Sequence, residues 1–186
     1  MNAPARWLGV LLLGYIGSVN AADWKMEAAD SRLEFVAVYE RDAAPGVFKK
    51  FDTRLRFDPD RLGASKLQVT VTVTSADMSS AEVNEAIRAP EWFDFARFAE
   101  AEFRSSEIRR TAQGLYVARG KLTLKGITQE MAVPFSWTAS GNTAALEGET
   151  TLKRSAFGIG TGEWENGDVI GLDVKVKYKI KLRKAS

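Results

Sequence analysis

The sequence predicts one all-β domain of about eight antiparallel strands. The clearest evidence is the segment 169–182, in which apolar residues at every second position alternate with glycine, aspartate and lysine. Alternation with a period of two places one face of a strand in the core and the other in water. Turn dipeptides such as Lys125-Gly126 and Asn166-Gly167 lie between segments of this kind. The pattern by itself permits either a β-sandwich or a closed barrel.

The other expected strands show the same alternation. They lie at 33–39, 51–57, 67–74 and 131–137. In the stretch from 115 to 124 the apolar positions change parity across Gly120, because Leu115 and Val117 are followed by Leu122 and Leu124. A change of parity at glycine predicts a β-bulge at that residue, which barrels use to bend their strands.

One segment has helical features. Ser79 followed by Glu82 fits a capping box, which predicts a helix that runs to about Arg88 and ends before Pro90. Pro90 also suits the first turn of a second short helix that carries three aromatic residues, Trp92, Phe93 and Phe95.

The N-terminus is typical of an export signal. Arg6 precedes an apolar run from 7 to 19, and small residues at Ala21 and Ala22 suit cleavage. The run is shorter than the roughly 20 residues that a membrane-spanning helix needs, although an uncleaved anchor remains the alternative. We therefore expect residues 1–21 to be a signal peptide and residues 22–186 to form a periplasmic domain.

Composition excludes several functional classes. The 26 basic and 24 acidic residues leave a net charge of only +2, which does not indicate nucleic acid as a partner. The chain has no cysteine and no histidine. Their absence removes thiolate and histidine-based catalysis and the usual ligands of transition metals. The sequence therefore predicts no metal site and no enzyme, with a carboxylate enzyme built on Glu163 and Asp168 as the remaining catalytic alternative.

Motifs spread from Trp24 to Leu182 resemble the YceI family. They include DSRLEF at 30–35, GVFKKF at 46–51, GKLTLKGIT at 120–128 and RSAFGIG at 154–160. The resemblance decides between sandwich and barrel. It implies a lipocalin-like antiparallel eight-stranded β-barrel with one or two short helices, and it implies binding of a polyisoprenoid lipid or quinone.

The predicted function is therefore to sequester or carry a long isoprenoid lipid, such as a ubiquinone-like molecule, in an apolar barrel interior. No other cofactor is expected. The inward rows of the strands place six residues in that interior: Phe35, Phe103, Phe135, Trp137, Val174 and Val176. Phe93 is expected over the mouth and Arg154 beside a polar head group. Leu122, Leu124 and Phe157 lie in the two most specific motifs and complete the predicted ligand-binding set.

In a second interpretation the fold is the same barrel, but its interior is filled by packed side chains. Each aromatic residue of the inward rows is as typical of a packed core as of a ligand contact. The segment 160–164 resembles family members found beside membrane b-type cytochromes. A filled barrel acting as a non-enzymatic accessory of such a membrane cytochrome is therefore the alternative function.

Overall fold

The computed structural model describes residues 21–185, so the predicted signal peptide lies almost wholly outside the described residues. The strands are β1 (Ala22–Met26), β2 (Arg32–Tyr39), β3 (Asp42–Phe48), β4 (Phe51–Phe57), β5 (Lys66–Thr72), β6 (Ala76–Asp77), β7 (Glu100–Ala112), β8 (Leu115–Leu124), β9 (Ile127–Ser140), β10 (Thr143–Lys153) and β11 (Asp173–Lys184). The helices are α1 (Ala81–Ala86) and the 3-10 turns η1 (Ala28–Asp30), η2 (Leu62–Ala64), η3 (Val73–Ser75), η4 (Arg154–Phe157) and η5 (Gly162–Trp164).

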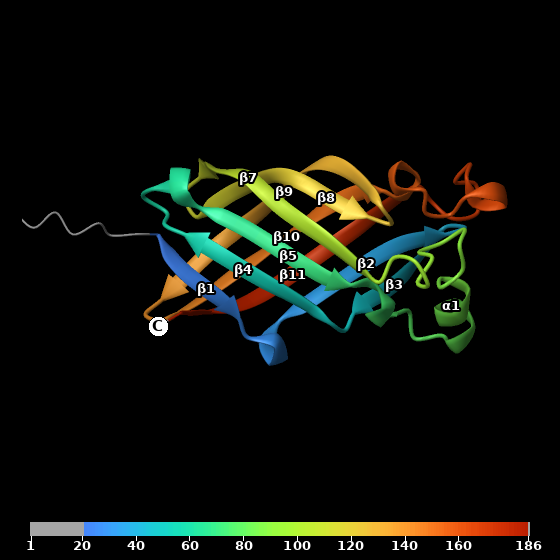
Figure 1. The fold of residues 1–186 in the computed structure, drawn as a ribbon, viewed down its shortest axis with the longest axis horizontal. Helices are drawn as coiled ribbons and strands as arrows, with labels where there is room; N and C mark the ends of the chain where they lie inside the picture. The colour runs from blue at the N-terminus through green and yellow to red at the C-terminus, as the bar shows by residue number, and fades with distance from the viewer. Residues whose placement is uncertain (1–20, 186) are drawn as a thin grey trace, which may run out of the picture.

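Eight of these strands form a closed antiparallel barrel (Figure 1). They pair in the order β1, β4, β5, β7, β8, β9, β10 and β11, and β11 pairs back with β1. The eight-stranded barrel predicted from the family resemblance is thus confirmed. The pairing is partial at one seam, because β9 and β10 pair only from Ser136 to Ser140 and from Thr143 to Glu147.

The long strand β11 holds two partners along one edge. Its C-terminal part pairs with β1, and its N-terminal part, Lys175 to Lys179, pairs with β2. The turn η1 separates β1 from β2, and β2 continues the wall through β3 and β6. The wall of the barrel is therefore extended on one side by a three-stranded flap.

The barrel has a packed end, where an aromatic cluster fills the interior. The cluster consists of Trp24, Phe57, Tyr116, Phe135 and Trp137. The rings of Phe57 and Trp137 are 4.8 Å apart, those of Phe57 and Tyr116 are 5.0 Å apart, and those of Trp24 and Trp137 are 5.1 Å apart. These are edge-to-face contacts of the kind that aromatic cores prefer. The C-terminus lies at this end (Figure 1).

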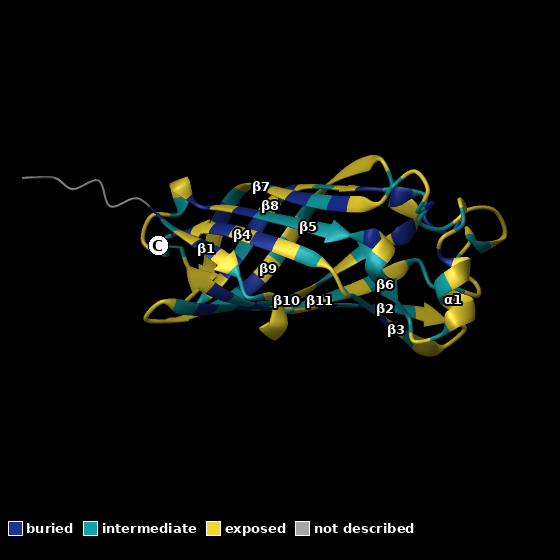
Figure 2. Cartoon of the chain, turned by 60° about the horizontal axis from the view of Figure 1, so that its bottom comes forward, coloured by how far each residue is buried: buried dark blue, intermediate teal, exposed yellow. Residues whose placement is uncertain are grey.

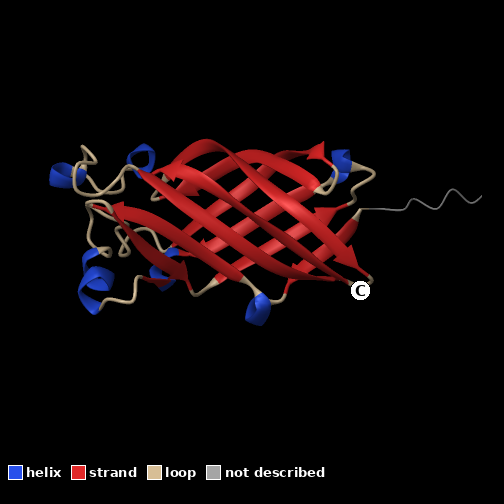
Figure 3. Cartoon of the chain, turned by 180° about the vertical axis from the view of Figure 1, so that it is seen from behind, coloured by secondary structure: helices blue, strands red, loops and turns tan. Residues whose placement is uncertain are grey.

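The opposite end, here called the open end, carries most of the short helices (Figure 3). It consists of the β2–β3 turn, the segment 77–99 with α1, the β8–β9 turn and the segment 154–172. Helix α1 has no buried residue and is largely exposed (Figure 2). No helix among residues 21–185 is long and apolar enough to cross a membrane.

The helical predictions are partly wrong. The N-cap of α1 is Ser80, whose hydroxyl accepts a hydrogen bond from the Val83 amide. Ser79 instead has a positive φ of 58° and donates its amide to the carboxylate of Asp77. The segment after Pro90 forms hydrogen-bonded turns in place of a second helix, because its aromatic side chains pack against the barrel wall.

The predicted bulge lies on the neighbouring strand. Ser105 pairs with Gly120 and Glu107 with Arg119, so the extra residue is Ser106 of β7. Strand β8 keeps its parity, because Leu115 is 47% exposed and the residues that face inward are the even ones. Gly120 lies opposite the bulge, where a Cβ would collide with the carbonyl oxygen of Arg104. The absence of a side chain at Gly120 allows the backbone of the bulged strand to pack directly against it.

Candidate functional site

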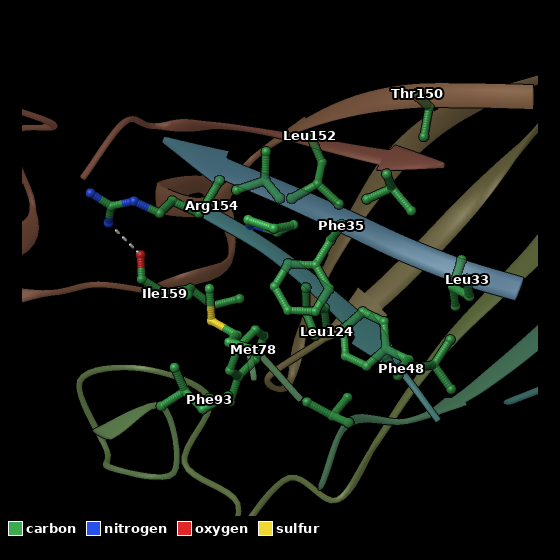
Figure 4. Close-up of a pocket in the computed structure, with 18 of the residues that line it drawn as sticks. Leu33, Phe35, Phe48, Met78, Phe93, Leu124, Thr150, Leu152, Arg154 and Ile159 are labelled. Atoms are coloured by element: carbon green, nitrogen blue, oxygen red, sulfur yellow. Dashed lines mark hydrogen bonds between the residues drawn. The ribbon is translucent and has the colours of Figure 1, made fainter. Parts of the chain in front are cut away.

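A cavity of about 750 Å³ occupies the half of the barrel toward the open end. Its wall consists mainly of apolar side chains from the inward faces of the strands (Figure 4). Phe35 and Phe48 lie together on one side, with ring centres 4.9 Å apart. Phe35 lies over Gly46 of the paired strand β3, and a Cβ at Gly46 would collide with its ring. Gly46 therefore allows this aromatic to lie against the cavity wall.

The floor of the cavity borders the packed core, because Leu67, Leu146 and Ile180 line the cavity and belong to the same core as the aromatic cluster. Along β4 the inward residues Phe51 and Thr53 line the cavity, whereas Leu55 and Phe57 belong to the packed core. The barrel interior is thus filled at one end and open at the other. A cavity closed at its base and open at its mouth suits a molecule that inserts one end and leaves the other near solvent.

Tyr178 of β11 forms part of this floor. Its ring crosses Gly148 of β10, where a Cβ would lie only 2.7 Å from the ring, and its hydroxyl donates to the carbonyl of Pro134 in β9. Burial, with a smaller effect from the charge of Glu149, raises the pKa of the Tyr178 hydroxyl above its ordinary value. The phenol is therefore neutral at physiological pH, and its donor is already used.

Eight of the eleven predicted ligand-binding residues line the cavity. They are Phe35, Phe93, Phe103, Leu122, Leu124, Arg154, Val174 and Val176. Phe135 and Trp137 do not, because they lie in the aromatic cluster at the packed end. Phe157 is also absent from the wall and is buried in a smaller cluster with Val73 and Ile159. Periodicity identified the inward face of each strand, but it does not give the height of a residue along the barrel axis.

The sequence prediction missed much of the wall at the open end. Some of these residues continue the inward rows of predicted strands, so alternation alone would have found them: Leu33, Val69, Val71, Met131, Val133 and Ile170. Others come from segments without strand periodicity, namely Met78, Val83, Ile87 and Trp164. Only the closure of the loops over the barrel brings this second group to the cavity.

Arg154 is the buried charged residue of the wall, and only 2% of it is exposed. Nε donates to Gly171 O at 3.0 Å, and the two terminal nitrogens donate to four further backbone carbonyls, those of Ile159, Gly160, Trp164 and Ile170, at 2.5–2.9 Å. Burial lowers the pKa of the guanidinium from its ordinary value. All five N–H donors are used, so Arg154 holds the segment 154–172 in place and has none left for a head group.

The segment 87–99 is fixed to the same part of the open end. The amide of Gly160 donates to Glu91 O at 2.7 Å, and Nζ of Lys125 donates to Pro90 O at 2.7 Å and to Gly158 O at 2.6 Å. Burial lowers the pKa of the Lys125 ammonium. Trp92 packs between Trp164, 5.9 Å away, and the Arg154 guanidinium, 5.7 Å from its ring. One side of the cavity mouth is therefore rigidly built.

The carboxylate pair expected for the catalytic alternative lies outside this cavity. Glu163 and Asp168 are exposed, and neither lines the wall. The nearest polar partner of Asp168 is Asn166, whose amide nitrogen is 2.6 Å from the carboxylate. Within residues 21–185 no group of acidic side chains is arranged to hold a metal ion.

Comparison with known proteins agrees with this architecture. The family model of the YceI-like domain matches residues 24–182. The chain belongs to the YceI-like family. A UPF0312 protein of Ectopseudomonas mendocina is 32% identical over 61% of this chain and 63% of its own length.

Two solved structures share the fold of this chain. BcnA of Burkholderia cenocepacia has a TM-score of 0.81 and 31% identity, covering 84% of this chain and 98% of its own. A polyisoprenoid-binding domain from Saccharophagus degradans has a TM-score of 0.70 and 14% identity, covering 89% of this chain and 99% of its own. The second likeness concerns the fold alone. Together these matches show that the chain is a YceI-like barrel.

Proposed function

We propose that this protein binds one long isoprenoid lipid or quinone with its chain inside the barrel, and that it sequesters or carries this molecule through an aqueous compartment. The observation that supports the proposal is the cavity of about 750 Å³, which has an apolar wall, a closed floor and an open mouth. The polyisoprenoid-binding domain with the same fold supports the choice of ligand class. No bond is made or broken in this function.

The volume of the cavity limits how many isoprene units of the ligand it can enclose. If each non-hydrogen atom takes about 30 Å³, as a water does in the liquid, a cavity of about 750 Å³ holds about 25 atoms. That corresponds to roughly five isoprene units. Each buried unit contributes on the order of 3–4 kcal/mol gross. A few units therefore offset the association cost of about 4–15 kcal/mol.

Affinity should depend on chain length in two regimes. In a series of prenyl alcohols from two to eight isoprene units, we expect affinity to rise about tenfold or more per unit up to roughly five units, and then to level off. Beyond that length the added units stay outside the cavity. Competition against one fluorescent prenyl probe measures the series. An affinity independent of length from the shortest member onward would contradict the proposal, as would no binding at any length.

Export is part of the same proposal. We propose that residues 1–21 direct the chain to the periplasm and are removed near Ala21 or Ala22, because a charged residue followed by a short apolar run is typical of a cleaved signal. N-terminal sequencing of the protein from its host tests this cleavage, and a retained Met1 would contradict it.

A further inference from the structure

We propose that the cavity selects its ligand by charge. It takes an isoprenoid chain whose polar end is an amine or an uncharged oxygen, and it rejects one that ends in a phosphate or carboxylate. This inference rests on the proposed function and specifies the chemical class of its ligand. Three features of the open end support it.

The first feature is the charge of the wall itself. The charged residues that line the cavity are Asp42, Glu82 and Arg154. Both carboxylates are exposed, and neither forms an ion pair with another described residue. The five donors of Arg154 all bind backbone carbonyls. An anion entering the cavity therefore meets two carboxylates, and the one guanidinium of the wall has no N–H left to donate to it.

The second feature is the charge of the surrounding loops. The segments 38–42, 77–99 and 154–172 expose eight carboxylates: Glu40, Asp42, Glu82, Glu85, Glu91, Glu163, Glu165 and Asp168. The same segments expose only three basic side chains, Arg41, Arg88 and Arg97, and the β8–β9 turn adds the partly buried Lys125, which donates to two backbone carbonyls. The whole chain carries a net charge of +2, so this acidity is local to the mouth. Clustered charge of one sign around an apolar opening attracts counter-charge and repels like charge.

The third feature is the apolar rim between these charges. Val38, Tyr39 and Val83 are 39%, 50% and 37% exposed, and all three also line the cavity. The apolar surface of the cavity thus continues outward to the carboxylates. A polar end that reaches this rim loses part of its water, which is costly for an anion without a cationic partner. An ammonium gains carboxylate partners there, and an uncharged oxygen loses less hydration free energy than an anion does.

Three ligands with the same twenty-carbon chain test the inference: geranylgeraniol, geranylgeranylamine and geranylgeranyl phosphate. Each displaces the same fluorescent prenyl probe below its own aggregation concentration. We expect the amine to bind at least as tightly as the alcohol, and the phosphate to bind about tenfold more weakly than the alcohol or worse. The ratio of the affinities for the amine and the phosphate should become smaller as the salt concentration rises from about 0.02 to about 0.5 M, because salt screens exposed charges.

Substitutions assign the effect to the wall carboxylates. In the double variant Asp42→Asn with Glu82→Gln, the ratio of the affinities for the amine and the phosphate should fall by at least about fivefold, since both side chains lie at the mouth. The matched control is Asp60→Asn in the loop before η2, where the carboxylate is 92% exposed and lies outside the cavity wall. This control should keep the affinity ratio of the unmodified protein. Both carboxylates of the double variant are exposed, so its fold should not change.

The outcomes separate this inference from the proposed function. If the phosphate binds as tightly as the alcohol, selection by charge is refuted while isoprenoid binding stands. If the double variant keeps the same ratio of affinities for the amine and the phosphate, the wall carboxylates do not cause the selectivity, and the inference is refuted. If none of the three ligands binds, the proposed function is refuted and the inference with it.

Discussion

Replacing Arg154 with methionine should lower the free energy of unfolding by about 3–5 kcal/mol. If unfolding is not a single transition, the loops of the open end should unfold before the barrel does. Methionine keeps much of the apolar stem but leaves five backbone carbonyls without their donors, those of Ile159, Gly160, Trp164, Ile170 and Gly171. Buried carbonyls without donors are the costly part of such a change. Urea unfolding followed by far-UV circular dichroism and tryptophan fluorescence measures both the global loss and any separate opening of the mouth.

Two further variants make this result specific. Arg154→Lys keeps the charge but offers three donors in place of five, so it should be destabilised to an intermediate degree. Arg41→Met removes an exposed arginine of the same open end that forms no ion pair with another described residue, and it should change stability by less than about 0.5 kcal/mol. If Arg154→Met were no less stable than Arg41→Met, the carbonyl contacts of Arg154 would not hold the segment 154–172 in place.

Replacing Val174 with tryptophan should abolish most isoprenoid binding while the barrel stays folded. Val174 faces the cavity from β11, so the indole has open space to enter and occupies volume that the ligand needs. We expect affinity for a five-unit prenyl alcohol to fall about tenfold or more, with a change in stability below about 1 kcal/mol. The competition assay and a thermal melt give the two values.

The packed end provides the contrasting variant. Ala118 is fully buried in the core cluster at that end, so Ala118→Leu adds bulk where no space exists. It should lower stability by about 1–3 kcal/mol and leave the affinity of the folded protein nearly unchanged. Should Val174→Trp instead behave like Ala118→Leu, destabilised and still able to bind, the half of the barrel around Val174 would be core and not a ligand site.

The strands were the most predictable part of the fold. Alternation in 169–182 and 51–57 correctly identified the inward face of β11 and β4, because one side of each is packed and the other is solvated. Closure of the barrel came from the family resemblance. The bulge was placed on the wrong strand, because a glycine that admits a neighbour's bulge looks in sequence like the bulge itself.

The candidate site was predictable only in part, for two physical reasons. The inward rows contained Val174 and Phe35 of the cavity, but also Phe135 and Trp137 of the aromatic cluster. Which of these faces open space depends on how far each strand is shifted along the barrel axis, and periodicity carries no such information. Arg154 was expected beside a polar head group; it lines the cavity, but its donors are satisfied by carbonyls from 159 to 171. Those partners are set by loop closure and not by local sequence.

Native mass spectrometry of the protein purified from its own host, followed by organic extraction, tests the central claim most directly. We predict one isoprenoid molecule per chain, bound to a chain that begins near Ala22, and the same stoichiometry after extraction and reloading with a prenyl alcohol of about five units. A chain that carries no lipid from its host and takes up none on reloading would contradict the account, because the cavity at the open end would then bind no isoprenoid.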